Sequence, residues 1–430
     1  MNLTGLLPVL LGDPAAARLA ASALAPVPSA REAQVDVVAP AGARPALLAG
    51  LLGQGTASVE DAADTGATAP AGAADLAGTG RPPGLVVAVV ATGREADDLA
   101  AALRCYLPPD ATDAVAVLPA WETLPHERLS PRSDTVARRL AVMRRLAHPE
   151  PGGPAGPVRA LVVPVRALLQ PVVEGLGELV PVALRAGDTA DLERVAADLV
   201  AAAYSRVDMV ERRGEFAVRG GILDVFAPTE DHPQRIEFWG DQVEEIRWFA
   251  VADQRSLEIA ADGLWAPPCR EMLLTEPVRS RAAALVEQLP GAAEMLEKMS
   301  QGIAVEGMES LAPVLVDRMV PVLDLLPDAL VVVVDPERVR RRAHDLQATT
   351  QEFLEAAWTS AAAGGSTPID LRAASFATYG QAREHALSLR QGWWTLSGFT
   401  LAAADAATDA ASAGDGDAGR PAADGSLVLD

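Results

Sequence analysis

Short apolar runs that are each followed by a helix start constrain the fold of this chain more than any other feature. Leu85–Ala91 (LVVAVVA) predicts a strand buried on both faces, and Thr92 and Gly93 then open a helix over Arg94–Leu107. Leu330–Val334 (LVVVV) predicts another such strand, and the Asp-Pro pair after it predicts a helix with aspartate as N-cap and proline in the first helical position. This alternation predicts a parallel sheet covered by helices, an α/β fold.

The stretch from Tyr204 to Arg255 has a different pattern, in which several short strands are joined by tight turns. Gly220 and Gly221 permit a bulge or the close approach of another chain, and Gly240 with Asp241 suits a two-residue hairpin turn. Side-chain alternation along the strands separates a core face from a solvent face. The core-facing positions are Phe216, Val218, Ile236 and Phe238, and the solvent-facing positions are Ala217, Arg219, Arg235, Glu237 and Trp239.

The solvent-facing set combines arginine with tryptophan, two residue types that are enriched in binding hot spots. We therefore predict a protein-binding surface that contains Arg219, Arg235 and Trp239. The pattern leaves an alternative open, in which Arg235 and Glu237 are ordinary surface charges and Trp239 covers a sheet edge.

Composition argues against several other classes of function. Lys+Arg 36 against Asp+Glu 58 gives a net charge of −22, so binding to nucleic acid would need a local basic patch. The helix predicted after Ser133 and Asp134 carries the arginines Arg138, Arg139, Arg144 and Arg145, which we interpret as a solvated helix face. Two distant cysteines and five scattered histidines predict no metal site and no disulfide framework, with a reducing cytoplasm as the compartment. No apolar run reaches the ~18 residues of a membrane span, so no membrane partner is expected.

The strand predicted over Val35–Ala39 is followed by a loop where a phosphate-binding loop would stand, but its residues do not fit that chemistry. Nucleotide hydrolysis needs a lysine on the phosphates and a serine or threonine on magnesium, whereas Gly42 is followed by Arg44 and Pro45. Lys298 is the only lysine and lies far away in the sequence. Asp335, at the position of the acidic partner motif, is better explained as a helix cap. We therefore expect no cofactor for this chain.

These patterns divide the chain into four parts. Residues 1–155 would form the first part of the parallel-sheet domain, with a disordered insert at about 53–84 that is rich in small and polar residues. Residues 156–252 would form an inserted α+β domain with an antiparallel sheet, and 253–358 would complete the first domain. Residues 359–430 would contain the start of a further small domain and a low-complexity tail. Because the end of the chain resembles the beginning of a strand, we expect a fragment of a longer protein.

Three blocks of this sequence resemble the N-terminal, UvrB-like part of the bacterial transcription-repair coupling factor. The blocks are Leu118–Leu146 (LPAWETLPHERLSPRSDTVARRLAVMRRL), Arg212–Glu258 (with RRGEFAVRGGILDVFAP, QRIEFWGDQVEEIRWF and DQRSLE) and Gly302–Val339 (GIAVEGMESLAPVLVDRMVPVLDLLPDALVVVVDPERV). The first two are shared in outline with the excision-repair helicase UvrB. That relative would keep a working phosphate loop, so the degraded loop at Ala39–Leu47 favours the coupling factor. Phe376–Thr400 resembles the beginning of the next domain of the family more weakly.

The resemblance implies a degenerate helicase-like domain that carries an inserted UvrA-binding domain, in a protein of transcription-coupled nucleotide excision repair. The full-length family recognises RNA polymerase stalled at DNA damage and displaces it with a DNA translocase that uses ATP and magnesium. Those domains would follow residue 430, so this chain would reach polymerase and DNA only through parts that it lacks. The family's UvrA-binding positions match Arg219, Arg235 and Trp239, although many members have phenylalanine at the last of these. We expect a monomeric, cytoplasmic adaptor rather than an enzyme.

Two other functions stay open at this point. The chain could be a nucleotide-binding α/β enzyme with a nonstandard phosphate loop, which measurable ATP binding or turnover would reveal. It could also be an incomplete gene product without an independent role, which poor solubility and the lack of a cooperative unfolding transition would reveal.

Overall fold

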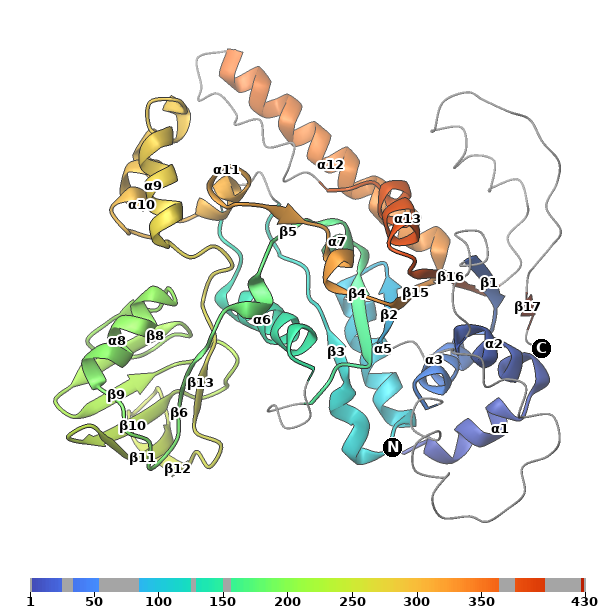
Figure 1. Ribbon diagram of the computed structural model, residues 1–430, viewed down its shortest axis with the longest axis horizontal. Coiled ribbons are helices and arrows are strands. Elements are labelled where there is room, and N and C mark those ends of the chain that lie inside the picture. The colour runs from blue at the N-terminus through green and yellow to red at the C-terminus, as the bar shows by residue number, and fades with distance from the viewer. Residues whose placement is uncertain are drawn as a thin grey trace.

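The computed structural model describes residues 2–24, 34–53, 85–124, 129–149, 156–362, 376–398 and 427–428. These residues form an α/β body around a parallel sheet, an inserted domain with an antiparallel sheet, and a small helical lobe. Figure 1 shows the inserted domain and the helical lobe one above the other, on the side of the body away from its N-terminal helices. Most of the predicted disordered insert, and the whole of the low-complexity tail at 402–425, lie outside the described residues.

The sheet of the body has seven strands in the order β17-β1-β16-β15-β2-β4-β3, and every neighbouring pair is parallel. The strands are β1 Gln34–Val38, β2 Leu85–Val90, β3 Val115–Val117, β4 Ala160–Pro164, β15 Ala329–Val334, β16 Gly392–Ser397 and β17 Leu427–Val428. The flanking helices are α1 Leu7–Leu11, α2 Pro14–Leu24, α3 Arg44–Gly53, α5 Gly93–Tyr106, α6 Ser133–Ala147, α7 Val165–Leu169, α12 Pro336–Ala362 and α13 Tyr379–Ser388. The sequence prediction of a parallel sheet covered by helices is confirmed.

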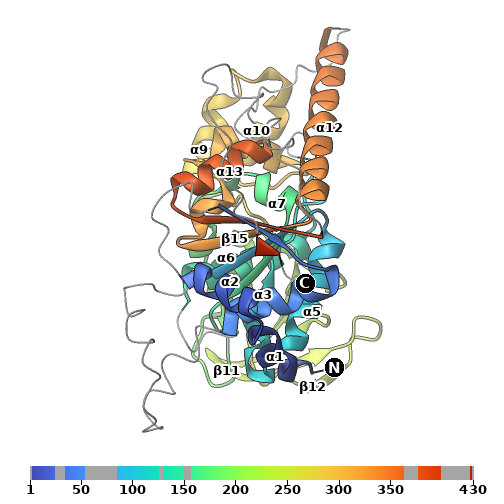
Figure 2. The same cartoon turned by 90° about the vertical axis from the view of Figure 1, so that its right-hand side faces the viewer.

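Both faces of this sheet are covered, because alternate side chains of each strand enter different cores. Leu85, Val87 and Val89 of β2 pack with residues of α6, α7, α12 and α13. Val86, Ala88 and Val90 pack with residues of α2, α3 and α5. Figure 2 shows α2 and α3 on one side of the sheet and α12 and α13 on the other. The predicted helix start after β2 is confirmed, since the Thr92 side chain accepts a hydrogen bond from the backbone of Glu95 in a capping box.

The inserted domain contains a six-stranded sheet in the order β12-β11-β10-β9-β8-β7, antiparallel except for the pair β7 and β8. Its elements are α8 Leu192–Ala201, β7 Ser205–Arg206, β8 Glu215–Arg219, β9 Ile222–Val225, β10 Gln234–Trp239, β11 Gln242–Phe249 and β12 Ser256–Ile259. Residues of α8 pack on one face of this sheet. The chain enters the domain through β6 Val182–Leu184 and leaves through β13 Leu264–Ala266, and these strands pair with each other.

The helical lobe follows the inserted domain and consists of α9 Glu276–Leu285, α10 Ala293–Ser300 and α11 Ala312–Leu315. Its core is rich in methionine, with Met272, Met299 and Met308 buried. The chain then returns to the body through β14 Met319–Val320, which pairs with β5 Val172–Val173.

Two of the predicted domain boundaries are wrong. The inserted domain does not begin at residue 156, because β4 lies between β2 and β3 in the body's sheet. It also does not end at 252, since β12 and β13 belong to it. The boundary at 156 was predicted from the change in composition at the Gly- and Pro-rich segment before β4. Such a segment can also lie within a single domain.

Residues 359–430 were predicted to begin a further domain, and this is wrong for the segment that forms β16. This strand lies between β1 and β15 and is buried along its whole length, so it is an inner strand of the body. Long-range parallel pairing of this kind has no local sequence signature.

The two cysteines are free, Cys269 is buried and Cys105 is partly exposed. Burial raises the pKa of the Cys269 thiol to about 12, so that at pH 8 only ~10⁻⁴ of it is thiolate. We expect iodoacetamide to alkylate Cys105 alone in the folded protein and both cysteines in urea, as counted by intact mass. Rapid modification of Cys269 without denaturant would contradict this arrangement.

Among the described residues, no helix is long and apolar enough to cross a membrane.

Candidate protein-binding surface

Two tight turns place the predicted binding residues on one sheet. Gly220 and Gly221 form the turn between β8 and β9, where Arg219 pairs with Ile222. Gly220 has a φ of +62, and a Cβ at Gly221 would lie 2.9 Å from the carbonyl oxygen of Phe238, so both positions suit glycine. Gly240, at φ +59, forms the predicted two-residue turn between β10 and β11.

The centre of the sheet's outer face is Asp224, whose side chain is only 1% exposed. Its neighbours across the strands are Ala217 on β8 and Arg235 on β10. Two guanidinium groups satisfy its carboxylate: Arg219 donates to Oδ2 at 2.5 Å, and Arg235 donates to Oδ1 at 2.7 Å and to Oδ2 at 2.9 Å. A buried carboxylate requires such partners, because an unpaired charge is strongly unfavourable in an apolar interior.

Arg235 was predicted to face solvent and to pair with a partner protein, but the structure places it largely inside the domain. Its side chain is 16% exposed, and its third nitrogen, Nη1, donates to the carbonyl of Gln254 at 3.2 Å. Its guanidinium also lies 4.7 Å from the ring centroid of Phe249. The hydrogen bonds to Asp224 raise the pKa of the Arg235 guanidinium above its ordinary value. Each of its three nitrogens is therefore engaged within the chain.

Arg219 and Trp239 remain available to a partner. The Arg219 side chain is 48% exposed and contacts Asp224 through one of its three nitrogens. Trp239 is 76% exposed, more than any other large hydrophobic side chain among the described residues. An arginine held by a buried carboxylate, on the same sheet as an exposed indole, fits a protein-binding hot spot.

Ala217 was predicted to face solvent and is instead buried at 1% exposure. It lies on the predicted face of the strand, but it packs with Val210, Phe226 and Phe249 in a small second core. Strand alternation shows which face a residue occupies, whereas the loops that cover this part of the face come from elsewhere in the chain.

Asp224, the residue that organises this surface, was not predicted from the sequence. The available indication was an acidic residue inside the otherwise apolar strand ILDV, on the same face as two arginines. The strand register that brings the three together becomes visible only in the folded sheet.

The degraded phosphate loop carries a second arrangement of charged groups. Arg44 is buried, and its Nη1 forms an ion pair with Asp335 Oδ2 at 2.7 Å. The loop of Gly42, Arg44 and Pro45 follows β1, and Asp335 follows β15, so both lie where the parallel strands end. A Cβ at Gly398, just after β16, would lie 3.0 Å from Arg44 Nη2. The guanidinium thus fills the space between these strand ends.

Asp335 does not fully behave as the predicted helix cap. Helix α12 begins at Pro336 as expected, and the backbone carbonyl of Asp335 accepts the bond from Val339. The residue has a φ of +53, however, and its carboxylate pairs with Arg44.

Comparison with known proteins agrees with this architecture. The UvrB interaction domain family matches residues 182–264, the segment from β6 to the start of β13. The transcription-repair-coupling factor of Mycobacterium bovis is 52% identical over 331 residues, which cover 73% of this chain and 26% of that protein. The Escherichia coli protein of the same name is 27% identical over 240 residues, covering 55% of this chain and 20% of that protein.

A second group of relatives is more distant. The UvrABC system protein B of Caldicellulosiruptor bescii is 31% identical over 129 residues, covering 30% of this chain and 20% of that protein. The chain spans about a quarter of the length of the mycobacterial coupling factors that it matches. Over most of its length, therefore, this chain corresponds to the UvrB-like N-terminal region of the transcription-repair-coupling factor family.

Proposed function

We propose that this chain is an adaptor module of transcription-coupled nucleotide excision repair, and that its inserted domain binds UvrA to recruit the excinuclease. The observation that carries this proposal is that an exposed Trp239 and a half-exposed Arg219 lie on the same sheet of a segment that matches the UvrB interaction domain. Trp239 would supply the buried apolar area, and Arg219 would pair with a carboxylate of UvrA. Arg235 would hold Asp224 and thereby orient Arg219.

The remaining functions of the family would lie in other parts of a longer protein. These are the release of stalled RNA polymerase and the ATP- and magnesium-dependent translocation on DNA. For this chain we propose a monomeric, cytoplasmic module without enzyme activity.

Calorimetric titration with purified UvrA tests the adaptor proposal. We expect saturable binding by the wild-type chain and about 30-fold weaker binding by Trp239→Ala, which corresponds to ~2 kcal/mol for a hot-spot residue. Arg219→Glu should also bind more weakly, because it places a negative charge opposite the carboxylate that we propose in UvrA. Arg235→Glu is a poor test, since it would place a second carboxylate against the buried Asp224.

Arg94→Glu is the matched control, because Arg94 lies on α5 of the body and its side chain is 92% exposed. It changes the net charge by the same amount as Arg219→Glu and should leave UvrA affinity unchanged. Equal binding of wild type, Trp239→Ala and Arg219→Glu, with all three folded, would argue against the proposed surface.

The nucleotide-binding alternative is disfavoured by the pair of Arg44 and Asp335, which fills the position where phosphate and magnesium would be held. We expect ATP with magnesium at 1 mM to leave the midpoint of thermal unfolding unchanged, because a ligand that does not bind the native state cannot stabilise it. UvrA serves as the positive control in the same assay. A rise of the midpoint with ATP that disappears in Arg44→Ala would establish a nucleotide site at this loop.

A further inference from the structure

The strand β16 forms a seam between two parts of the body's sheet. Among the described residues, β1 pairs with β16 and β17, and β16 pairs on its other side with β15 (Figure 1). Backbone pairing therefore joins β1 to the strands β15, β2, β4 and β3 only through β16. The segment that forms β16 is distant in sequence from β1 and is separated from β15 by α12 and α13. Tertiary contacts, rather than local propensity, must hold such a seam together.

The ion pair of Arg44 and Asp335 bridges this seam. Arg44 is the first residue of α3, which follows β1, and Asp335 comes directly after β15. Because β1 and β15 flank β16, the pair crosses the end of β16 and spans two strand spacings, about 10 Å. A Cβ at Gly398, directly after β16, would lie 3.0 Å from Arg44 Nη2. The guanidinium thus lies over the end of the seam strand.

Backbone hydrogen bonds hold the same strand end from both sides. The amide of Asp335 donates to the carbonyl of Leu396 at 3.0 Å, and the amide of Ala39 donates to the carbonyl of Ser397 at 2.9 Å. Arg44 Nε donates to the carbonyl of Ala39 at 3.4 Å. Asp335 has a φ of +53, which a residue other than glycine keeps only where the surrounding structure fixes it. The strained backbone and the ion pair therefore meet at the end of β16.

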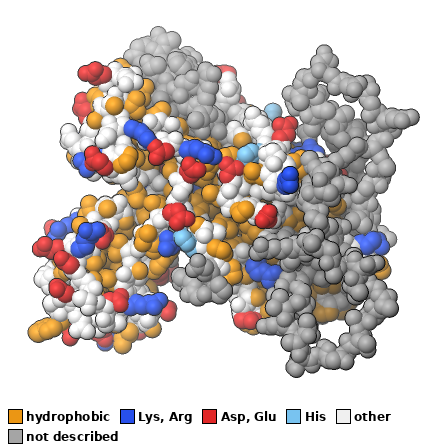
Figure 3. All heavy atoms as spheres, in the orientation of Figure 1, with side chains coloured by type: hydrophobic (Ala, Val, Ile, Leu, Met, Phe, Trp, Pro, Cys, Tyr) orange, Lys and Arg blue, Asp and Glu red, His pale blue; other side chains and the backbone are white. Residues whose placement is uncertain are grey.

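Burial separates this ion pair from most others among the described residues. Figure 3 shows blue and red side chains mixed over the surface of the inserted domain and the helical lobe, and Lys298 with Glu294 is one such exposed pair. Exposed pairs contribute little, because water screens them. The Arg44 side chain is only 9% exposed, and that of Asp335 is 39% exposed. A guanidinium so far removed from water is strongly unfavourable without its carboxylate, so loss of the pair should open the seam.

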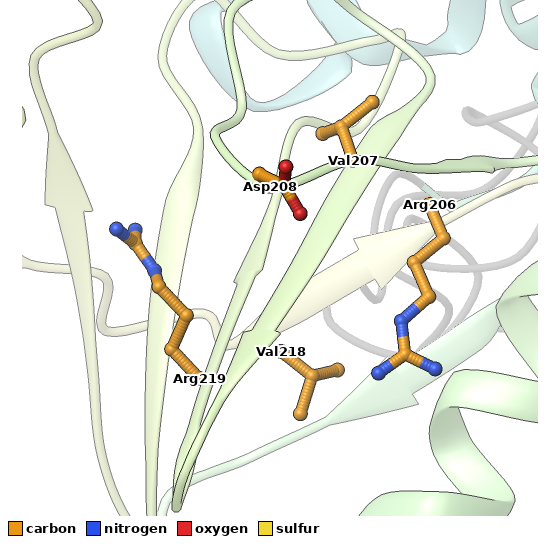
Figure 4. Close-up of a pocket in the computed structure, with 5 residues that line it drawn as sticks. All are labelled: Arg206, Val207, Asp208, Val218 and Arg219. Carbon is orange, nitrogen blue, oxygen red and sulfur yellow. The ribbon is translucent and has the colours of Figure 1, made fainter.

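Arg44 also differs from arginines that an outside ligand can reach. Arg206 and Arg219 line a pocket of about 560 Å³ in the inserted domain, and Figure 4 shows their guanidinium groups pointing apart, with Val218 between them. Arg219 is half exposed, whereas the Arg44 guanidinium is enclosed by its own chain at the strand ends. Its contacts are those of a structural group that joins two parts of the sheet.

We propose that the pair of Arg44 and Asp335 is a latch that closes the seam along β16. When the latch is broken, β1 and β16 open while the other strands of the sheet stay paired. Such an opening is a local unfolding event, with a lower free energy than unfolding of the whole domain. The degraded phosphate loop thereby has a structural role, since its arginine holds two strand ends together where a nucleotide phosphate and magnesium would otherwise be held.

Hydrogen exchange of the intact chain, measured by mass spectrometry of peptides, tests the latch. We expect Arg44→Ala to accelerate amide exchange in β1 and β16 about 10-fold and to leave β2 and β4 unchanged. Asp335→Asn should accelerate exchange in the same two strands about 5-fold, because asparagine tolerates the positive φ and only the charge is lost. Arg338→Ala is the matched control. Arg338 also lies on α12 and pairs with Glu95, but its side chain is 63% exposed, so its removal should change neither strand.

Gly398→Ala tests the position of the guanidinium independently. The added methyl group would displace the guanidinium and should accelerate exchange in β16 about 3-fold in the wild-type background. In the Arg44→Ala background the same substitution should have no effect, because the group that it displaces is gone. An equal effect in both backgrounds would show that the guanidinium does not lie over the end of β16.

The pattern of exchange across the sheet decides the proposal. Faster exchange confined to β1 and β16, in Arg44→Ala and Asp335→Asn but not in Arg338→Ala, would establish the latch. If both variants accelerate exchange equally in all strands, the pair stabilises the body as a whole and the latch is wrong. Unchanged exchange in both variants would also overturn it. Should Arg44→Ala not fold, Asp335→Asn supplies the same comparison between strands.

Discussion

Arg235→Ala is expected to destabilise the inserted domain by about 3 kcal/mol, near the lower end of the range for breaking a buried ion pair. The substitution removes two of the three hydrogen bonds to Asp224, whose side chain is 1% exposed, and leaves Arg219 as its only guanidinium partner. It also removes the contact with Phe249 and the bond to the Gln254 carbonyl. Urea unfolding followed by tryptophan fluorescence would measure the loss.

Arg219→Ala should change stability much less than Arg235→Ala does. Because its side chain is half exposed, its removal should lower the free energy of unfolding by no more than about 1 kcal/mol. Under the proposed function, Arg219→Ala should reduce UvrA affinity by more free energy than it removes from the stability of the domain. A destabilisation by Arg219→Ala equal to that of Arg235→Ala would show that the two arginines share one structural role.

Asp224→Ala combined with Arg235→Ala provides the internal check on this explanation. If the instability of Arg235→Ala arises from an uncompensated carboxylate, removing that carboxylate should restore part of the stability. Additive losses in the double variant would indicate that packing, not charge, is responsible.

Arg139→Ala is expected to have the largest effect on stability in the body, about 3–5 kcal/mol. Arg139 is fully buried, and its Nε lies 2.5 Å from Oε1 of Glu271, whose side chain is 1% exposed. Its Nη1 donates to the carbonyl of Pro119 at 2.7 Å, and the indole of Trp121 donates to Oε1 of Glu271 at 2.9 Å. Arg139 stands on α6, whereas Glu271 follows the inserted domain, so the pair joins the body to the returning chain.

The ion pair of Arg139 and Glu271 also contains buried polar atoms without hydrogen bonds, which destabilise the folded state. Arg139 Nη2 and Glu271 Oε2 are buried and have no hydrogen-bond partner among the described residues. Arg139→Met with Glu271→Leu should therefore be much more stable than either single variant, because it removes both charges and their unsatisfied atoms together. Thermal unfolding of the two single variants and the double variant gives the coupling energy, and a coupling near zero would contradict this explanation.

The helix that carries Arg139 illustrates the limit of periodicity. The arginines of α6 were predicted to form a solvated face. Arg138 is exposed as predicted, but Arg139 is buried, Arg144 donates to the carbonyl of Leu179, and Arg145 donates to the carbonyl of Gly156. Helical spacing places these residues on the helix and says nothing about which segments will cover it. A charged face becomes an interior surface wherever a later part of the chain supplies acceptors.

The sequence by itself determined the elements whose information is local. Leu85–Val90 and Ala329–Val334 are strands because continuous apolar runs suit burial on both faces, and Gly240 marks a hairpin turn because it readily adopts a positive φ. The motif blocks also indicated the family, and the comparisons agree with it. The replacement of a lysine by Arg44 at the phosphate loop was likewise visible in the sequence alone.

Only the tertiary structure decided how the functional groups are paired. It placed β16 inside the body's sheet, buried Arg139 against Glu271, joined Arg44 to Asp335, and turned Arg235 inward to Asp224. Each of these arrangements brings together residues from different elements, several of them distant in sequence. Their free energy depends on how far the paired charges are removed from water, and that burial is created by the whole fold rather than by any local pattern.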